Sequence, residues 1–404
     1  MEDISPLDNP ILHYAWGSAT AIPELLSRPN PSLTPWAEMW MGAHPKAPSR
    51  VLGRAGVELL SDLVRRSPEA VLGRTVCDRF GGRFPFLFKV LAASGPLSIQ
   101  AHPGPIQAQE GFDRENRMKI PLDAPHRNYR DPNPKPECIC ALSTFHGLCG
   151  FRPPAEMAAT LSLAVQSPQE AVQEIATLAD AAGGDGIRRF FLFLMELPPD
   201  RRAALVQAAG DRAGLRRHED PALGLVARLA EEYPGDPGIL APLMLNVVRL
   251  EPGEAMFLPP GQLHAYMGGV GIELMADSDN VLRGGLTTKH VDIAELARVL
   301  TFEAAHPRIL QARSESPVER VYPTGDDAFR LSVISVAPGR PYRSSPVRSV
   351  EIMICTEGAA LVRQHNAKER EHQVVRGVSF LVPAGVPSYE IKGAATLYKA
   401  AVPL

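Results

Sequence analysis

One pattern of glycine and proline occurs twice in this 404-residue chain and restricts its fold more than any other feature. The first copy, residues 253–264, follows the form G-x5-P-x-G-x2-H, and the second copy, residues 377–388, begins 124 positions later. The initial glycine and the later Pro-x-Gly are typical of tight turns on either side of a short apolar strand. Each copy therefore delivers its last side chain at the head of a following strand. That side chain is His264 in the first copy and Ser388 in the second.

The repeat resembles the second motif of the cupin superfamily, whose members are small jelly-roll β-barrels that hold a metal ion inside. One such segment can arise by chance in a β-protein, whereas two segments of identical spacing rarely do. We therefore predict two barrels. Because only the first copy ends in a histidine, we expect a metal in the first barrel and none in the second.

The middle of the chain has a different composition. Residues 154–233 are rich in Ala, Leu, Glu and Arg, and helix start signals recur there, such as Ser167 or Asp220 followed by proline. We expect about five helices in this block, whereas the preceding residues 1–150, rich in Pro and Gly, are typical of strands and turns. A helical block between two β blocks indicates an insertion into a β-fold.

The predicted fold class is mainly β with a helical insertion, namely two cupin-like jelly-roll barrels plus an all-α domain. The expected domains are a discontinuous catalytic barrel (1–150 and 236–325), a helical insertion (151–235) and a C-terminal cupin-like barrel without metal (326–404).

Two other segments supply candidate metal ligands. Residues 97–102 alternate with period two, which on a strand places Ser98, Gln100 and His102 on one face. An edge strand with a solvated face is the alternative, although such faces usually carry Lys, Glu or Thr. Glu137 opens an otherwise apolar strand, and a buried carboxylate must be paired, protonated or metal-bound. The candidate ligands are therefore Gln100, His102, Glu137 and His264.

This ligand set favours zinc. Two imidazoles, one carboxylate and one amide oxygen suit an ion of intermediate softness with an open position for water. A net charge of about +1 would remain to polarise a substrate oxygen. Cys138 and Cys140 look like a second half-site, but on a strand both sulfurs face away from Glu137, so we interpret them as core residues.

The composition narrows the function classes. With 42 basic and 45 acidic residues, the net charge of −3 gives no electrostatic reason to expect nucleic acid or an anionic membrane as partner. The first residues lack the features of a signal peptide, and no apolar run approaches the roughly 18–20 residues that span a bilayer. Five cysteines argue against a disulfide framework. We expect a cytoplasmic protein without nucleic-acid or membrane partners.

Further blocks resemble the signature sequences of type I mannose-6-phosphate isomerases. They are QAHP (100–103), NPKPE (133–137), FHGLCGFRP (145–153), PPGQLHAY (259–266) and SDNVLRGGLTTK (278–289), with two N-terminal blocks at 14–17 and 38–45. Such a series in family order is far more specific than a lone motif. The chain departs from the family pattern at Gly104-Pro105, where the family has Asp-Lys, at Pro134, where it has histidine, and at His146, where it has an acidic residue.

The resemblance implies a zinc enzyme that interconverts mannose 6-phosphate and fructose 6-phosphate, built from a catalytic cupin barrel, a helical insertion and a second barrel. It places the zinc ligands on the four residues already named, and the arginine after Ser-Asp-Asn on Arg283. A sugar phosphate would be the small-molecule partner, and we expect a monomer.

Aldose–ketose isomerisation through an enediol needs an electrophile, a base and an anchor for the phosphate. Zinc would supply the first, and Arg283 would add fixed positive charge, unless it only pairs with Asp277 or Asp279. The base remains open among Lys135, whose charged neighbours favour the neutral amine, Lys89 and a zinc-bound water. Candidates for contact with the sugar or its phosphate are Trp16, Lys89, Ser98, Tyr266, Glu273, Asp279, Arg283 and Lys289.

Two alternatives keep the cupin fold. A non-haem metal dioxygenase also uses two histidines and a carboxylate, but it needs a redox metal and open positions for oxygen and substrate. A metal-stabilised sugar-binding or storage cupin would lack turnover. The charges of Lys135, Arg283 and Lys289 beside a metal argue against the storage protein.

Overall fold

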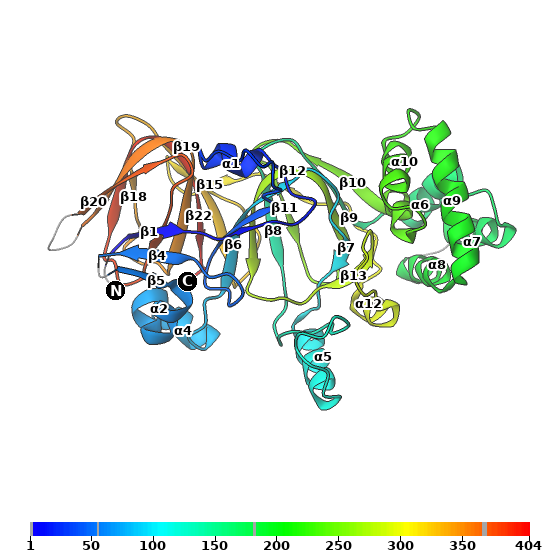
Figure 1. Ribbon diagram of the computed structural model, residues 1–404, viewed down its shortest axis with the longest axis horizontal. Coiled ribbons are helices and arrows are strands. Elements are labelled where there is room, and N and C mark those ends of the chain that lie inside the picture. Colours follow the sequence, from blue (N-terminus) through cyan, green and yellow to red (C-terminus); the bar gives the residue numbers. More distant parts are fainter. Residues whose placement is uncertain (1–2, 55, 181–182, 366–369) are drawn as a thin grey trace.

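The computed structural model describes residues 3–54, 56–180, 183–365 and 370–404. It is mainly β, with two sheets of eleven strands each lying side by side and a bundle of helices at one end (Figure 1). None of the helices in these described residues combines the length and apolarity needed to cross a membrane.

The first sheet contains the candidate ligands. Its strands in spatial order are β14 (Ile309–Leu310), β11 (Ala255–Leu258), β8 (Glu137–Ala141), β12 (His264–Ala276), β6 (Phe86–Ala93), β3 (Glu38–Met41) and β2 (Ile11–Leu12). Four more strands join off this path, namely β7 (Ile99–Ala101), β9 (Phe145–Phe151), β10 (Leu245–Leu250) and β13 (Leu282–Gly285). The long strand β12 pairs with β6, β7, β8 and β9, and it therefore connects all the segments that carry predicted ligands.

The second sheet is built around β19 (Glu351–Gln364) and β22 (Tyr389–Ala401). The other strands are β15 (Arg313–Ser314), β16 (Glu319–Val321), β17 (Arg330–Val336), β18 (Tyr342–Arg343), β20 (Arg370–Val375), β21 (Ser379–Val382), β1 (Ser5–Asp8), β4 (Arg50–Gly53) and β5 (Gly56–Leu59). Strand pairing crosses the domain boundaries expected from the sequence, because β1 pairs with β21 with Ser5 opposite Leu381. The chain thus begins in the sheet in which it ends.

Period-two alternation separates the two faces of the first sheet. On β6, Phe86, Phe88 and Val90 pack into a core cluster that also contains Ile352 and Ile354 of the second sheet. The intervening β6 residues face the other way and line a cavity. Cys138 and Cys140 belong to the cluster between the sheets, which confirms that they are core residues.

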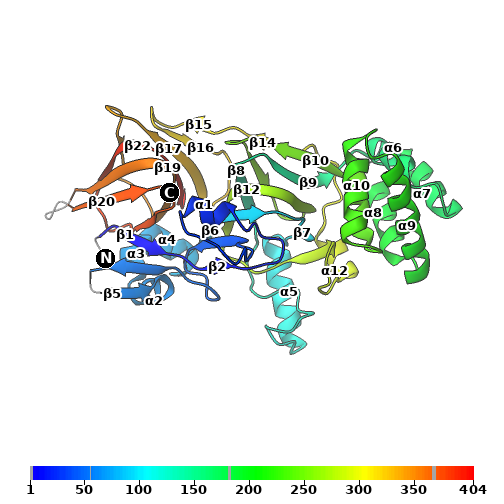
Figure 2. The same cartoon turned by 45° about the horizontal axis from the view of Figure 1, so that its top comes forward.

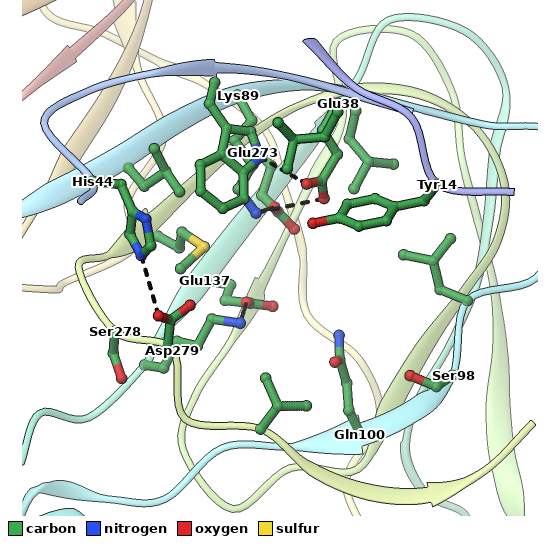
Figure 3. Close-up of a pocket in the computed structure, with 18 of the residues that line it drawn as sticks. Tyr14, Glu38, His44, Lys89, Ser98, Gln100, Glu137, Glu273, Ser278 and Asp279 are labelled. Atoms are coloured by element: carbon green, nitrogen blue, oxygen red, sulfur yellow. Dashed lines mark hydrogen bonds and ion pairs between the residues drawn. The ribbon is translucent and has the colours of Figure 1, made fainter. Parts of the chain in front are cut away.

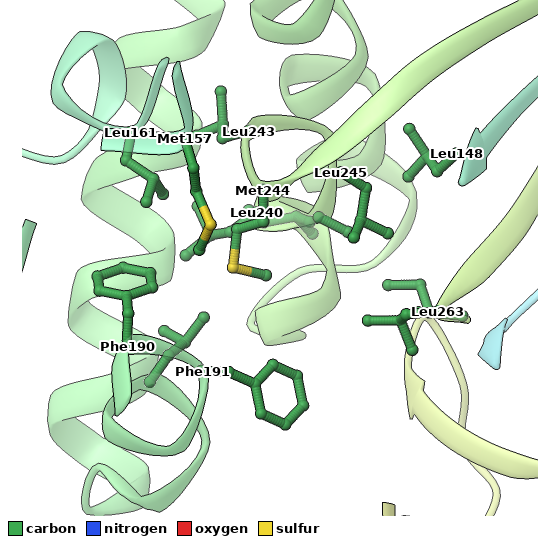
Figure 4. Close-up of a cluster of buried hydrophobic side chains, with 14 of the residues drawn as sticks. Leu148, Met157, Leu161, Phe190, Phe191, Leu240, Leu243, Met244, Leu245 and Leu263 are labelled. Atoms are coloured by element: carbon green, nitrogen blue, oxygen red, sulfur yellow. The ribbon is translucent and has the colours of Figure 1, made fainter. Parts of the chain in front are cut away.

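Five helices lie in the described part of residues 154–232, as many as the sequence predicted. They are α6 (Pro154–Ala164), α7 (Gln169–Ala179), α8 (Gly184–Glu196), α9 (Pro199–Leu215) and α10 (Pro221–Glu232). Asp220 caps α10, since its carboxylate accepts a hydrogen bond from the backbone N–H of Ala222 at 2.7 Å. Side chains such as Met157 and Phe191 share one hydrophobic core with Leu148 and Leu263 of the first sheet (Figure 4). The short helices η1 (Pro237–Leu240) and α11 (Ala241–Met244) then connect the bundle to β10.

The expectation of only strands and turns in residues 1–150 was wrong. This part also contains α1 (Ala21–Leu25), α2 (Leu60–Arg66), α3 (Pro68–Leu72), α4 (Arg74–Phe80) and α5 (Pro105–Arg117). The α5 helix projects from the body of the molecule (Figures 1 and 2), so it needs no long apolar stripe that periodicity could reveal. Its first turn is stabilised locally, because Gln107 Oε1 accepts a hydrogen bond from the N–H of Gly104 at 2.9 Å.

Candidate metal centre

Three buried side chains from separate segments converge at one point of the first sheet. His102 follows β7, Glu137 begins β8 and His264 begins β12. One ligand atom from each lies within 4.8 Å of the others. His102 Nε2 is 3.4 Å from Glu137 Oε1, and His264 Nε2 is 3.4 Å from Glu137 Oε2. The convergence follows from strand pairing, because β12 lies beside both β7 and β8.

The hydrogen bonding of this cluster fits a metal ion. His102 Nε2, Glu137 Oε2 and His264 Nε2 are buried without a hydrogen-bond partner. The other ring nitrogens are held: His102 Nδ1 lies 2.7 Å from Asn280 O, and His264 Nδ1 lies 2.9 Å from Gln262 O. A carbonyl at Nδ1 fixes the tautomer whose Nε2 lone pair is available to a metal.

The spacing of the ligand atoms also fits zinc. Bonds of about 2.0–2.1 Å at tetrahedral angles place two N or O ligands about 3.4 Å apart. Gln100, the predicted fourth ligand, is the register partner of His264 and points into the adjoining cavity (Figure 3). His102, Glu137 and His264 therefore fit three ligands of a zinc site, and Gln100 stays a prediction as the fourth.

Burial and charge set the protonation states that a cation requires. Burial, assisted by the positive charge of Lys135, lowers the pKa of His102 to about 4, so the imidazole is neutral at physiological pH. Burial alone would raise the pKa of Glu137, but Lys135 and His102 outweigh it and hold that pKa well below its usual range. Lys135 Nζ lies 3.0 Å from Glu137 Oε1.

A cavity of about 410 Å³ opens beside the cluster. Eleven of the residues singled out from the sequence line it: Trp16, Lys89, Ser98, Gln100, Lys135, Glu137, Tyr266, Glu273, Asp279, Arg283 and Lys289. The structure thus brings the predicted candidates together, and their individual roles stay predictions. Trp16 stacks on Tyr14, with ring centroids 5.6 Å apart.

Lys89 is enclosed by acidic groups on one wall of the cavity (Figure 3). Its Nζ lies 2.8 Å from Glu273 Oε2 and 3.6 Å from Glu38 Oε1, and Trp40 Nε1 donates to Glu38 at 2.7 Å. Burial would lower the pKa of Lys89, but Glu273 and Glu38 raise it far above its ordinary value. The amine is therefore a fixed ammonium, which disfavours Lys89 as the base.

A second acidic group at the cavity is paired as well. Asp279 Oδ2 lies 2.8 Å from Lys46 Nζ and 3.4 Å from His44 Nε2. Although burial opposes it, the hydrogen bonds from His44 and Lys46 lower the pKa of Asp279. Asp279 is therefore an anion that is already neutralised within the wall.

Three cationic side chains at the cavity, unlike Lys89 and Lys46, have no carboxylate partner among the described residues. Within the described residues, the side chains of Arg130, Arg283 and Lys289 form no ion pair, so Arg283 does not pair with Asp277 or Asp279. Burial and the charge of Arg130 lower the pKa of Arg283, and burial, Arg283 and Arg130 lower the pKa of Lys289. Mutually repelling cations beside a cavity are a typical site for a polyanionic group.

Known proteins are similar to this chain in sequence. A family model described as phosphomannose isomerase type I, catalytic domain, matches residues 4–154. Mannose-6-phosphate isomerase of Salmonella typhimurium is 40% identical over 360 residues, which cover 89% of this chain and 90% of that protein. The chain belongs to the type I phosphomannose isomerase family. The mannose-6-phosphate isomerase of Homo sapiens is 33% identical, with 89% of this chain and 88% of that protein covered.

Solved structures extend this family relationship to the whole fold. A crystal structure of zinc-bound mannose 6-phosphate isomerase superposes with a TM-score of 0.88 at 35% identity and covers 99% of this chain and 100% of that chain. A mutant of phosphomannose isomerase from Salmonella typhimurium superposes with a TM-score of 0.89 at 35% identity and the same coverage. The family predicted from the sequence motifs is confirmed.

Some cavity residues were missed at the level of sequence. Glu38, Trp40 and His44 lie in the N-terminal block that pointed to the phosphomannose isomerase family, but nothing in that block shows that their side chains face the cavity. Arg130 lies shortly before the NPKPE block, and this position was the only hint in the sequence that it could take part in the site. The cation cluster depends on contacts between segments about 150 residues apart.

Proposed function

We propose that the protein is a zinc-dependent aldose–ketose isomerase that interconverts mannose 6-phosphate and fructose 6-phosphate through an enediol. The observation that carries this proposal is the combination of two features of the described residues. Three buried ligand atoms have no hydrogen-bond partner there, and the adjoining cavity presents three cations that form no ion pair. Membership in the family and the zinc-bound relatives support the same reaction.

The finer architecture belongs to the same proposal. We infer that each eleven-stranded sheet is a cupin-like jelly-roll barrel and that the five helices form an inserted all-α domain. Alternate residues line the cavity on β6 (Leu87, Lys89, Leu91) and on β12 (Glu273, Met275), which supports a barrel with these side chains inside. The residue boundaries of these domains, a cytoplasmic location and a monomeric state stay predictions.

Gln100, His102, Glu137 and His264 would hold the zinc ion. When bound, the ion supplies a Lewis acid that polarises sugar oxygens and stabilises the negative charge of the enediolate. Arg283 is positioned to assist, because it is the register partner of Gln100 on the neighbouring strand. Its planar guanidinium suits two oxygens, and its charge remains free for them.

The phosphate would bind at the remaining cations. Arg130 and Lys289 have no carboxylate partner within the described chain, and together their charge matches that of a phosphate dianion. Ser98, which also lines the cavity, offers a hydroxyl donor. Trp16 and Tyr266 line the same cavity and would contact the sugar ring.

Lys135 suits the role of base better than Lys89, and it would act only as the neutral amine. Its Nζ lies at the cavity wall and beside the ligand Glu137, whereas the amine of Lys89 is held charged by two carboxylates. In the reaction the neutral Lys135 amine would take the proton from the carbon next to the carbonyl and return it to the carbonyl carbon, while a second proton moves from the hydroxyl oxygen to the carbonyl oxygen. Glu273 and Glu38 would act through Lys89, keeping its ammonium directed at the sugar oxygens.

Chelation tests the proposal directly. The protein as purified should convert fructose 6-phosphate to mannose 6-phosphate, lose this activity on dialysis against a chelator, and regain it with one equivalent of zinc per chain. A protein that binds zinc and sugar phosphate without turnover would instead be a sugar-binding cupin. Stoichiometric iron with oxygen uptake would identify a dioxygenase and reject the isomerase.

A further inference from the structure

Asn280 joins the metal cluster to the segment that carries Arg130. It is fully buried, with none of its surface exposed. Its backbone carbonyl accepts the hydrogen bond from His102 Nδ1 at 2.7 Å. The residue was noted in the sequence only as part of the SDN block, without a role of its own.

The side chain of Asn280 holds a different segment, residues 130–133. Its Oδ1 accepts hydrogen bonds from the backbone N–H of Arg130 at 2.7 Å and of Asp131 at 3.3 Å. Its Nδ2 donates to the carbonyl oxygens of Asp131 at 2.8 Å and of Asn133 at 2.9 Å. The amide thus uses both its acceptor and its donors on one stretch of backbone.

The contact between the two segments is reciprocal. Asp131 Oδ2 accepts a hydrogen bond from the N–H of Asp279 at 2.8 Å, and Asp131 Oδ1 accepts one from the N–H of Asn133 at 3.0 Å. These bonds fix the backbone on which Arg130 is mounted. The Arg130 side chain itself has no ion pair within the described residues, so only its backbone directs it toward the cavity.

We propose that Asn280 is a positioning residue that sets the affinity for the phosphate group of the substrate by holding Arg130 in place. The inference rests on the proposed function, because it takes Arg130 as a phosphate ligand. It also separates two tasks within one residue: the side chain of Asn280 serves phosphate binding, and its carbonyl serves the metal ligand His102. A substitution of the side chain should therefore affect the first task and spare the second.

The experiment is a double-mutant cycle with Asn280→Ala, Arg130→Ala and the combined variant. Either single substitution should raise KM for mannose 6-phosphate and the Kd of inorganic phosphate about 10-fold or more, because a charge-assisted contact is lost or misplaced. The kcat should change by less than about threefold, and bound zinc should stay at one per chain. In the combined variant the two effects should fail to multiply, since Asn280 acts through Arg130.

Asn246→Ala is the matched control. Asn246 also donates its amide to several backbone carbonyl oxygens, those of Gly150 at 2.9 Å and Ala305 at 2.8 Å among them, but it lies outside the cavity. This variant should lose stability with KM and phosphate affinity unchanged. A merely structural role for Asn280 would give the same result as the control.

Three results would be decisive. An unchanged KM in Asn280→Ala, or effects that multiply in the combined variant, would overturn the inference. If Asn280→Ala does not fold, Asn280→Asp replaces it in the cycle. Aspartate has the volume of asparagine and keeps the acceptor oxygen. It puts an oxygen in place of Nδ2, however, and so loses the hydrogen bonds to the carbonyl oxygens of Asp131 and Asn133. Phosphate binding without isomerase activity in the unsubstituted protein would reject the proposed function while leaving the cycle in Kd interpretable.

Discussion

The two sheets bury the same kind of ion cluster and use it differently. In the first sheet, Lys89 lies between Glu273 at 2.8 Å and Glu38 at 3.6 Å. In the second, Lys399 lies between Glu319 at 2.8 Å and Glu351 at 3.5 Å. In both sheets the carboxylates outweigh the effect of burial and raise the pKa of the lysine.

The difference lies in what surrounds each cluster. In the second sheet, Lys399 also donates to Tyr342 OH at 2.9 Å, and Tyr389 OH donates to Glu351 at 2.7 Å, so the lysine and this glutamate have partners besides each other, although the nearby Arg348 Nε has none among the described residues. In the first sheet, neighbouring ligand atoms such as Glu137 Oε2 and His264 Nε2 have no hydrogen-bond partner. A satisfied buried network indicates a structural role, whereas unsatisfied groups beside a cavity indicate a ligand.

The repeat gives the strongest test of whether only the first sheet binds a metal, because it ends in His264 in one copy and in Ser388 in the other. His264→Ala should abolish zinc binding and lower kcat at least about 10³-fold, since several kcal/mol of barrier lowering depend on the ion. Ser388→Ala should leave both unchanged. Metal analysis and isomerase assays of the two variants check this, and stoichiometric zinc in His264→Ala would contradict the ligand set.

Removing the lysine from each cluster compares the two interiors directly. Lys89→Met and Lys399→Met should each destabilise the protein by about 3–5 kcal/mol, because each leaves buried carboxylates without their cation. Only Lys89→Met should also lower kcat/KM of the folded protein. Urea unfolding and assays of the folded fraction measure the two effects, and a similar loss of kcat/KM in Lys399→Met would show that the second cluster also serves the reaction.

A substitution at Arg283 tests whether a cation at the cavity of the first sheet acts on the reacting atoms. Arg283→Ala should retain zinc and lower kcat about 10²- to 10³-fold, which is typical for the loss of one group that stabilises an oxyanion. Stability should change little, because the side chain makes no ion pair within the described residues. Unfolding curves, zinc content and kcat of the variant measure these effects, and full activity would exclude Arg283 from the reaction.

Much of the first interior could be predicted from the sequence, because a strand's period of two is a local property. This alternation placed Glu137 on one face of its strand and Cys138 and Cys140 on the other face. The repeat placed His264 at the head of a strand. The structure confirms these local assignments. The order of family motifs then identified the family.

What the sequence did not predict depends on distant contacts. Arg130 reaches the cavity because Asn280, 150 positions away, holds its backbone. Glu38 becomes part of the ion cluster only because β3 pairs with β6. The pairing of β1 with β21 joins the ends of the chain, and no periodicity within either strand encodes it. The α5 helix buries only the small residues Ala108 and Gly111 together with Glu115, so its sequence shows no stripe of large apolar residues.

The smallest predicted effect concerns a carboxyl group at the seam between the two sheets. Asp277 follows β12 and lines a cavity of about 110 Å³ together with Phe84 of the first half and Ala328, which precedes β17. Burial, reinforced by the carboxylates of Asp131 and Asp279, raises the pKa of Asp277 to about 6, although His44 lowers it. In the folded protein this carboxyl group is therefore more stable without its charge.

The pH dependence follows from that raised pKa. Between about pH 4 and 6 the unfolded chain loses the proton while the folded chain keeps it, so this group makes stability fall as pH rises. Above pH 6 the penalty is constant at about 3 kcal/mol, since one pKa unit corresponds to about 1.4 kcal/mol. Asp277→Asn should therefore stabilise the protein by up to about 3 kcal/mol at pH 8 and hardly at all at pH 4. Urea unfolding at the two pH values measures the difference.

Asp279→Asn provides the control of opposite sign. Because His44 and Lys46 lower the pKa of Asp279, its charge stabilises the folded protein above the ordinary carboxyl range and loses this effect as pH falls. The variant should thus be less stable than the unsubstituted protein at pH 8, with a difference that shrinks toward low pH. If Asp277→Asn also lost stability at pH 8, the charged carboxylate of Asp277 would stabilise the fold, which would contradict its raised pKa. Asp277 would then be part of the ion pairs around the cavity of the first sheet.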